Sequence, residues 1–125
     1  MSETKKKKPI RTLVFLLILI AAVVIVGVRV KTYLHVRQEN AATAAFNAGN
    51  YQEAVDGYLA LLPKLDGQDA ERVEESVAEC YLRIGESPET SAAEQMRWYK
   101  KALEYDEDCI TSPTLLKSIR AYTAE

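Results

Sequence analysis

Residues 13–28, LVFLLILIAAVVIVGV, contain no polar or charged side chain. The hydrocarbon core of a bilayer is about 30 Å thick, and a helix that rises about 1.5 Å per residue needs roughly 20 residues to cross it. Residues 10–30 reach this length if Arg11 and Arg29 extend their charged ends toward the two membrane surfaces. The sequence therefore predicts one transmembrane helix over residues 10–30, in contact with the lipid bilayer.

The two sides of this apolar run differ in charge. Residues 1–37 carry eight Lys or Arg and one acidic residue, a net charge of +7, whereas residues 38–125 carry eight Lys or Arg and seventeen acidic residues, a net charge of −9. An acidic surface disfavours nucleic acid, because phosphate binding needs clustered Lys and Arg. We expect a basic N-terminal tail over residues 1–9, a single small acidic domain over residues 31–125, and no nucleic-acid partner.

The basic flank before the apolar run fits both a cleaved signal peptide and an uncleaved signal anchor. A signal peptide usually has an apolar region of about 7–15 residues, followed at once by small residues at the cleavage site. Here the run is longer, Arg29 and Lys31 follow it, and the Ala-x-Ala pattern lies further on, at residues 42–44. We therefore expect the helix to be retained as an anchor of a single-pass membrane protein.

Lys and Arg near the ends of a span set its orientation, and the more basic flank stays in the cytoplasm. Five such residues precede the run, within residues 5–11, and three follow it, within residues 29–37. This asymmetry predicts a cytoplasmic N-terminus and an extracytoplasmic C-terminal domain, which is periplasmic if the cell is bacterial. The alternative is the inverted topology, with the domain in the cytoplasm.

The residues that follow the run show helical periodicity interrupted by turn residues, which predicts an all-α class. Between Gly27 and Gly49 there is neither Gly nor Pro, so the span is expected to continue into the first helix of the domain. The pairs Asn50 with Glu53 and Ser91 with Glu94 have the spacing of capping boxes. Asp69 is predicted to cap a further helix, and Ser112 with Pro113 to begin a closing helix over about residues 113–123.

The stretch FNAGNYQEAVDGYLALL, residues 46–62, resembles the centre of a tetratricopeptide repeat (TPR). It has the Gly-x-Tyr turn, an Ala three residues after that Tyr, and an aromatic residue four further on. In that family each repeat of about 34 residues is a helical hairpin, and stacked repeats form a concave groove. The resemblance implies a first repeat over about residues 36–66, with packing positions at Ala42, Gly49, Tyr51, Ala54, Tyr58 and Leu61.

A second, degenerate repeat follows over about residues 69–108, with residues 86–91 as an insertion in its turn. Its matching positions are Val77, Ala78, Tyr81, Gly85, Tyr99, Ala102 and Leu103. Neither repeat keeps the tryptophan that the family carries in its first helix. The expected architecture is one transmembrane helix followed by a short TPR-like solenoid of two hairpins and a closing helix.

In well-understood members of the family, Lys, Arg and Asn on the inner helices bind the C-terminal carboxylate of a partner. The matching positions here hold a different set of side chains, so we expect no carboxylate clamp. Glu75 and Glu79, one turn apart, favour a basic or amide-rich segment, although a solvated helix face is the simpler explanation. Trp98 is either an anchor for a partner or a residue packed beneath the closing helix. The candidate partner-binding residues are Glu39, Asn47, Arg72, Glu75, Glu79, Arg83 and Trp98.

The sequence offers no catalytic constellation, and we expect neither an enzyme nor a cofactor, a metal or a small-molecule substrate. Glutamates on an exposed helix face lack the pocket and the shifted pKa that acid–base catalysis needs. Cys80 and Cys109 make no metal-ligand spacing and are predicted to be two free thiols rather than a disulfide. We predict a membrane-anchored protein–protein interaction scaffold, an accessory or structural subunit of a larger complex with protein partners in or at the membrane. The alternative is a membrane-tethered chaperone or adaptor that binds peptides.

Overall fold

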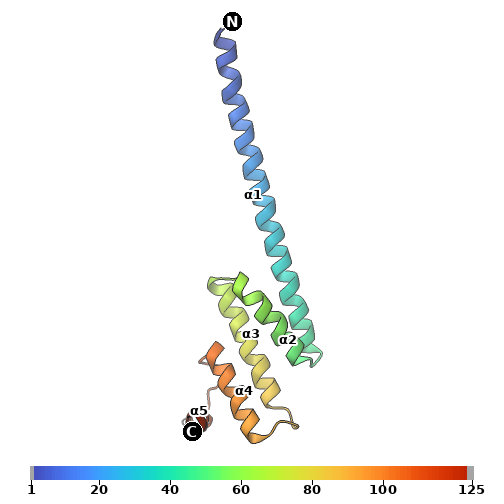
Figure 1. The fold of residues 1–125 in the computed structure, drawn as a ribbon, viewed down its shortest axis with the longest axis vertical. Helices are drawn as coiled ribbons and strands as arrows, with labels where there is room; N and C mark the ends of the chain where they lie inside the picture. The colour runs from blue at the N-terminus through green and yellow to red at the C-terminus, as the bar shows by residue number, and fades with distance from the viewer. Residues whose placement is uncertain (1, 124–125) are drawn as a thin grey trace. The chain divides into compact units, whose positions relative to one another are not determined.

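The structure is a computed structural model, and it describes the backbone of residues 2–123 and the side chains of residues 9–122. Within this part the chain forms helices and loops: α1 (Ser2–Asn47), α2 (Tyr51–Leu61), the 3-10 helix η1 (Leu62–Lys64), α3 (Gly67–Gly85), α4 (Ala92–Tyr105) and α5 (Pro113–Thr123) (Figure 1). The predicted all-α class is confirmed. The chain divides into two compact units, Met1–Val36 and Arg37–Glu125.

The first unit is helical over its described residues and exposes its apolar side chains. Large hydrophobic residues from Ile10 to Val36 are exposed around the whole helix, and Val23 reaches 70%. A helix that is apolar on every side is typical of a segment that faces lipid. The first helix is therefore long and apolar enough to cross a membrane. The side chains of residues 5–8, on which the predicted orientation largely depends, lie outside the described residues.

The second unit begins with residues 37–47, the end of α1, which pack against α2. Gly49 has a φ of +84°, a conformation that glycine adopts without strain, and the chain reverses there. The two helices approach closely, because a Cβ atom placed on Gly57 would lie 3.0 Å from the Cβ of Ala42. The hydroxyls of Thr43 and Tyr58 lie 2.6 Å apart. Residues 37–47 are therefore a wall of this unit's core.

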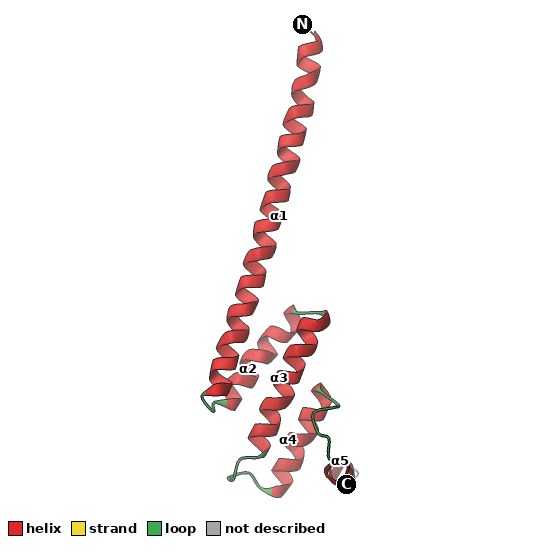
Figure 2. Cartoon of the chain, turned by 180° about the vertical axis from the view of Figure 1, so that it is seen from behind, coloured by secondary structure: helices red, strands yellow, loops and turns green. Residues whose placement is uncertain are grey.

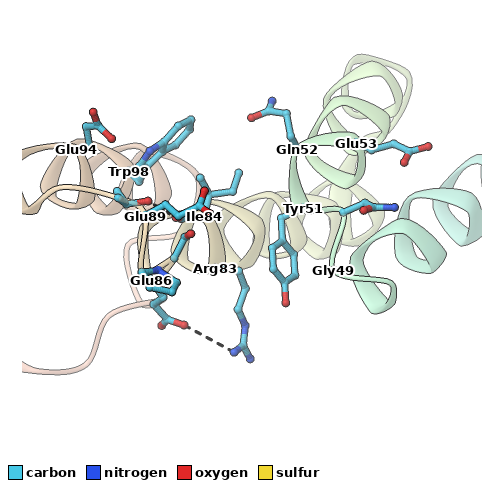
Figure 3. A pocket seen from close by; sticks show the side chains of 14 residues that line it. Gly49, Tyr51, Gln52, Glu53, Arg83, Ile84, Glu86, Glu89, Glu94 and Trp98 are labelled. Carbon is cyan, nitrogen blue, oxygen red and sulfur yellow. Dashed lines mark hydrogen bonds and ion pairs between the residues drawn. The ribbon is translucent and has the colours of Figure 1, made fainter.

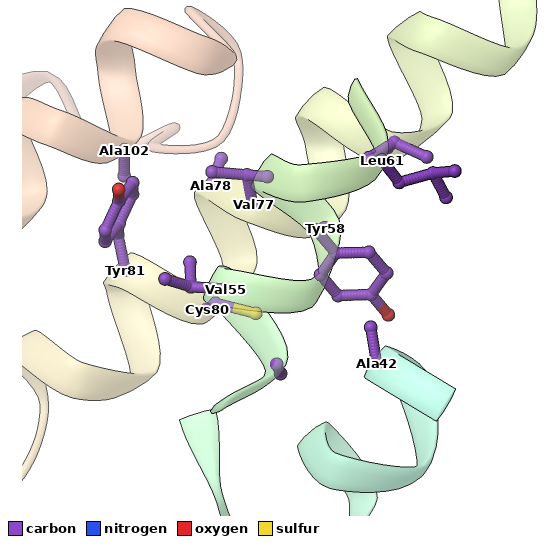
Figure 4. Packing of buried hydrophobic residues seen from close by; sticks show 11 residues of the cluster. Ala42, Val55, Tyr58, Leu61, Val77, Ala78, Cys80, Tyr81 and Ala102 are labelled. Atoms are coloured by element: carbon purple, nitrogen blue, oxygen red, sulfur yellow. The ribbon is translucent and has the colours of Figure 1, made fainter. Parts of the chain in front are cut away.

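The main core cluster lies between the end of α1 and helices α2, α3 and α4 (Figure 4). Its buried members are Ala42, Ala54, Val55, Tyr58, Leu61, Val73, Val77, Ala78, Cys80, Tyr81 and Ala102. Helix α3 contacts both α2 and α4, and Figure 2 shows it between them. The predicted burial of Ala54, Tyr58 and Leu61 is confirmed, and Val55 is buried as well.

A second, smaller cluster joins α4 to the closing helix α5. Tyr99, Ile110 and Ile119 are its buried members, and Leu115 and Leu116 of α5 pack against them. Gly85, the last residue of α3, allows α3 to approach the same Tyr99, since a Cβ there would lie 3.0 Å from its ring. Leu115, Leu116 and Ile119 of the predicted closing helix thus belong to a cluster shared with the preceding helix.

Helices α2, α4 and α5 start where predicted, but only two of the four predicted caps form a side-chain bond. Asn50 precedes α2 but makes no side-chain capping bond, because its backbone (φ −89°, ψ 68°) lacks the extended conformation that aims a cap at the first turn. Helix α3 follows Asp66, so it begins ahead of the predicted cap Asp69, which lies in its first turn. By contrast, Ser91 Oγ accepts a bond from the Glu94 amide at 3.2 Å, and Ser112 Oγ from the Leu115 amide at 3.3 Å.

Cys80 and Cys109 are free thiols, the first buried and the second half-buried. Burial raises the pKa of both thiols to about 11, and the negative charges of Glu79 and Asp106 add to the effect at Cys80 and Cys109 respectively. Both side chains therefore prefer to keep their protons in the folded state.

We expect the second unit to lose stability as the pH rises from about 9 toward 11. A thiol whose pKa is raised by folding contributes its full stabilisation below the unfolded-state pKa of 9.0, and this is lost as the pH approaches the folded-state pKa of about 11. Thermal unfolding midpoints, measured across this range for the natural chain and for Cys109→Ala, test the expectation. The midpoint should fall less in the variant; an equal fall in both would contradict the assignment.

Candidate partner-binding site

The seven residues predicted from the sequence all lie in the second unit, and the structure divides them among different places. Arg72, Glu75 and Glu79 line one groove. Arg83 and Trp98 line a separate, wider hollow. Asn47 is exposed at the end of α1 and lines neither, and Glu39 is bound to Arg72.

The groove is formed by the end of α1 together with α2 and α3 and has a volume of about 230 Å³. Its lining residues are Phe46, Tyr58, Arg72, Glu75, Ser76 and Glu79. The ring of Phe46 meets that of Tyr51 edge-on, with centroids 5.1 Å apart, and this contact limits its movement. Glu75 and Glu79 are exposed and one turn apart on α3. The groove therefore combines an apolar wall with a negatively charged edge.

Arg72 is engaged within the chain. Its Nη2 and Nε atoms donate to Glu39 Oε1 at 2.8 and 3.1 Å, and its Nη1 atom donates to Asp69 Oδ1 at 2.8 Å. These bonds, that to Glu39 first, raise the pKa of the Arg72 guanidinium. The bonds between Arg72 and Glu39 join α3 to the end of α1. Both side chains are therefore already engaged with each other within the chain.

The hollow is wider, with a volume of about 1050 Å³, and lies where the turn before α2 faces the connection between α3 and α4 (Figure 3). Four glutamates and one arginine are among its lining residues: Glu53, Glu86, Glu89, Glu94 and Arg83. Arg83 is ion-paired with Glu79 at 3.2 Å and with Glu86 at 3.7 Å. The formal charge of the lining is therefore negative.

No family model, curated protein or solved structure matches this chain. The resemblance to tetratricopeptide repeats accordingly stays a prediction that rests on the residues quoted above. Within the described residues, no three His, Cys, Asp or Glu side chains come together as a group that could hold a metal ion.

Trp98 is held in place by its neighbours. It packs against the main core cluster rather than the one beneath α5. Its ring stacks on that of Tyr81 with centroids 5.7 Å apart, and the ammonium of Lys101 lies 4.8 Å from its centroid. It also lines the hollow. The same residue therefore packs against the core and borders an open surface.

Glu86, Glu89 and the other glutamates of the hollow were not among the residues predicted from the sequence. Residues 86–91 were expected to form an insertion in a turn, and the seven predicted residues all lie in helices. One signal was present in the sequence. The turn before Glu53 and the turn after Gly85 each connect the two helices of a predicted hairpin, and the two hairpins are adjacent. Turns at the same end of stacked hairpins lie near each other, and their charges add.

Proposed function

We propose that this protein is a membrane-anchored protein–protein interaction scaffold, an accessory or structural subunit of a larger membrane complex. The groove at α3 is the observation that carries the proposal. Phe46 and Tyr58 give it an apolar wall, and Glu75 and Glu79 give it a charged edge. Interfaces between proteins use this combination of buried aromatic anchors and a polar rim. The apolar first helix supplies the anchor in the membrane.

The proposal includes a TPR-like arrangement of the second unit. Its support is that successive helices pack in order, α3 on α2 and α4 on α3, and that small residues lie where helices approach, as at Gly57 and Ala42. In that family the inner helices receive the partner. A stack this short leaves its end faces open, and a partner protein then acts as the next layer.

The proposal also places the second unit on the extracytoplasmic side. The basis is the excess of Lys and Arg before the apolar run. Added protease should therefore leave the domain intact in sealed vesicles that expose their cytoplasmic face. Digestion of the domain in such vesicles would support the inverted topology.

Site-specific photo-crosslinking in native membranes tests the function. A photoreactive amino acid replaces Ser76, which lines the groove, or Glu107, an exposed residue of the α4–α5 connection, in the full chain. We expect one discrete adduct of higher mass from position 76 and none from position 107. Glu75→Lys with Glu79→Lys should reduce the adduct about ten-fold, because both carboxylates border the groove.

The proposal fails if no groove position gives an adduct and the gently solubilised protein runs as a lone monomer. The second candidate, a membrane-tethered chaperone or adaptor for peptides, is favoured by the small groove, which suits a short segment. It predicts many adducts of differing mass from position 76 in place of one.

A further inference from the structure

The hollow beside Trp98 lies apart from the groove at α3, and no residue lines both. We infer that it binds a segment of a partner protein that carries Lys or Arg side chains. The inference rests on the proposed function, that the second unit binds protein, and it adds a second contact with a stated chemistry.

The walls of the hollow are aromatic and apolar as well as charged. Tyr51 from α2 and Trp98 from α4 line opposite sides, and Ile84 from α3 lies between them (Figure 3). A volume of about 1050 Å³ accommodates several side chains of an incoming segment. Tyrosine and tryptophan are the residues on which interfaces most often depend, because a rigid ring covers much area at little cost in conformational entropy.

The charged residues that line the hollow determine which charge a bound segment must carry. Glu53, Glu89 and Glu94 are exposed at the rim, and Arg83 is already ion-paired with Glu86. Together with Glu86 they outnumber the single arginine of the lining four to one, so the hollow has a negative field. A segment with Lys or Arg gains from this field, whereas an acidic segment is repelled.

The Trp98 ring at the border of the hollow already contacts one cation. Lys101 places its ammonium 4.8 Å from the ring centroid of Trp98 and 5.8 Å from that of Tyr81, so this aromatic pair already holds a cation of the chain itself. A carboxylate cluster alone attracts any cation. An indole beside carboxylates favours a cation on an alkyl stem or in a planar guanidinium, which are the side chains of Lys and Arg.

Trp98 also supplies the readout, since it is the chain's single tryptophan. The full chain, in nanodiscs of zwitterionic lipid, is titrated with a short peptide that alternates Arg with Ser and contains no tryptophan. We expect a saturable change in Trp98 emission. A peptide with Glu in place of Arg should give none.

Matched double variants separate the hollow from the general acidity of the domain. Glu89→Lys with Glu94→Lys reverses two charges that line the hollow, and Glu71→Lys with Glu107→Lys reverses two exposed charges elsewhere. The first pair should raise the Kd for the Arg peptide at least about ten-fold, and the second less than about three-fold. If the lysine variant of the hollow loses its circular dichroism signal, Glu89→Gln with Glu94→Gln tests the same site, with a smaller rise in Kd.

Three results would overturn the inference: no change in Trp98 emission with the Arg peptide, equal weakening in the two double variants, or equally tight binding of spermidine. If the adduct at position 76 forms, each of these results rejects the inference but not the proposed function. Conversely, specific binding of the Arg peptide by a chain that gives no adduct in native membranes and runs as a lone monomer would retain the hollow as a binding site and reject the proposed function.

Discussion

Val77→Asp is expected to abolish cooperative unfolding of the second unit. Val77 is fully buried at the centre of α3, between α2 and α4, in the main core cluster. The substitution removes about 1.5–3 kcal/mol of hydrophobic stabilisation and buries a carboxylate without a partner, which costs several kcal/mol more. The free energy of unfolding of a small domain is about 5–15 kcal/mol, so the combined loss approaches the whole stability of this unit.

Far-ultraviolet circular dichroism and Trp98 emission of the full chain in detergent measure the effect. Trp98 stacks on Tyr81 of the core, so its emission reports the packing of the second unit. Gln68→Asp is the matched control, because Gln68 is exposed on the same helix and its replacement should change stability by no more than about 0.5 kcal/mol. A variant of Val77 that melts as sharply as the natural chain would show that α3 does not form the centre of the core.

Leu17→Arg combined with Val24→Arg is expected to remove the protein from the membrane. Each arginine near the middle of a span costs about 2.5–3.5 kcal/mol for insertion, whereas each Leu, Ile, Val or Phe contributes only about 0.3–0.6 kcal/mol. Two arginines therefore cancel most of the favourable free energy of residues 13–28. The measurement is the share of the full chain that stays in the membrane pellet after alkaline carbonate extraction.

Leu17→Ala with Val24→Ala is the control for this pair, since alanine keeps the segment uncharged, and the protein should stay in the pellet. The intact mass of the natural chain from the same pellet addresses the signal-peptide alternative. A mass that includes residues 1–28 supports an anchor. A soluble natural chain that lacks these residues would show that the segment is a cleaved signal.

Much of the fold could be predicted because helix periodicity is a local property. Val73, Val77, Cys80 and Tyr81 repeat at helical spacing, and all four are buried. The caps were less certain because a cap depends on backbone geometry as well as on residue type. Ser91 has the extended conformation and forms its bond, whereas Asn50, with the same spacing to a glutamate, does not.

The sites could be predicted only in part, because they depend on residues that are far apart in the sequence. Arg72 and Glu39 were both assigned to partner binding, and the structure bonds them to each other across 33 positions. The hollow assembles from residues 49–53 and 83–98, and no pattern within either stretch predicts that they face one another. Only Arg83 and Trp98 of its lining were anticipated.

Cleavage at one sequence pattern in α1 would damage the second unit. The Ala-x-Ala pattern at residues 42–44 lies in the part of α1 that forms a wall of the core. Cleavage after Ala44 would remove Ala42, which is 4% exposed, and Thr43, whose hydroxyl meets that of Tyr58. It would also separate Glu39 from Arg72. A peptidase acting at this pattern would therefore release a second unit without one wall of its core.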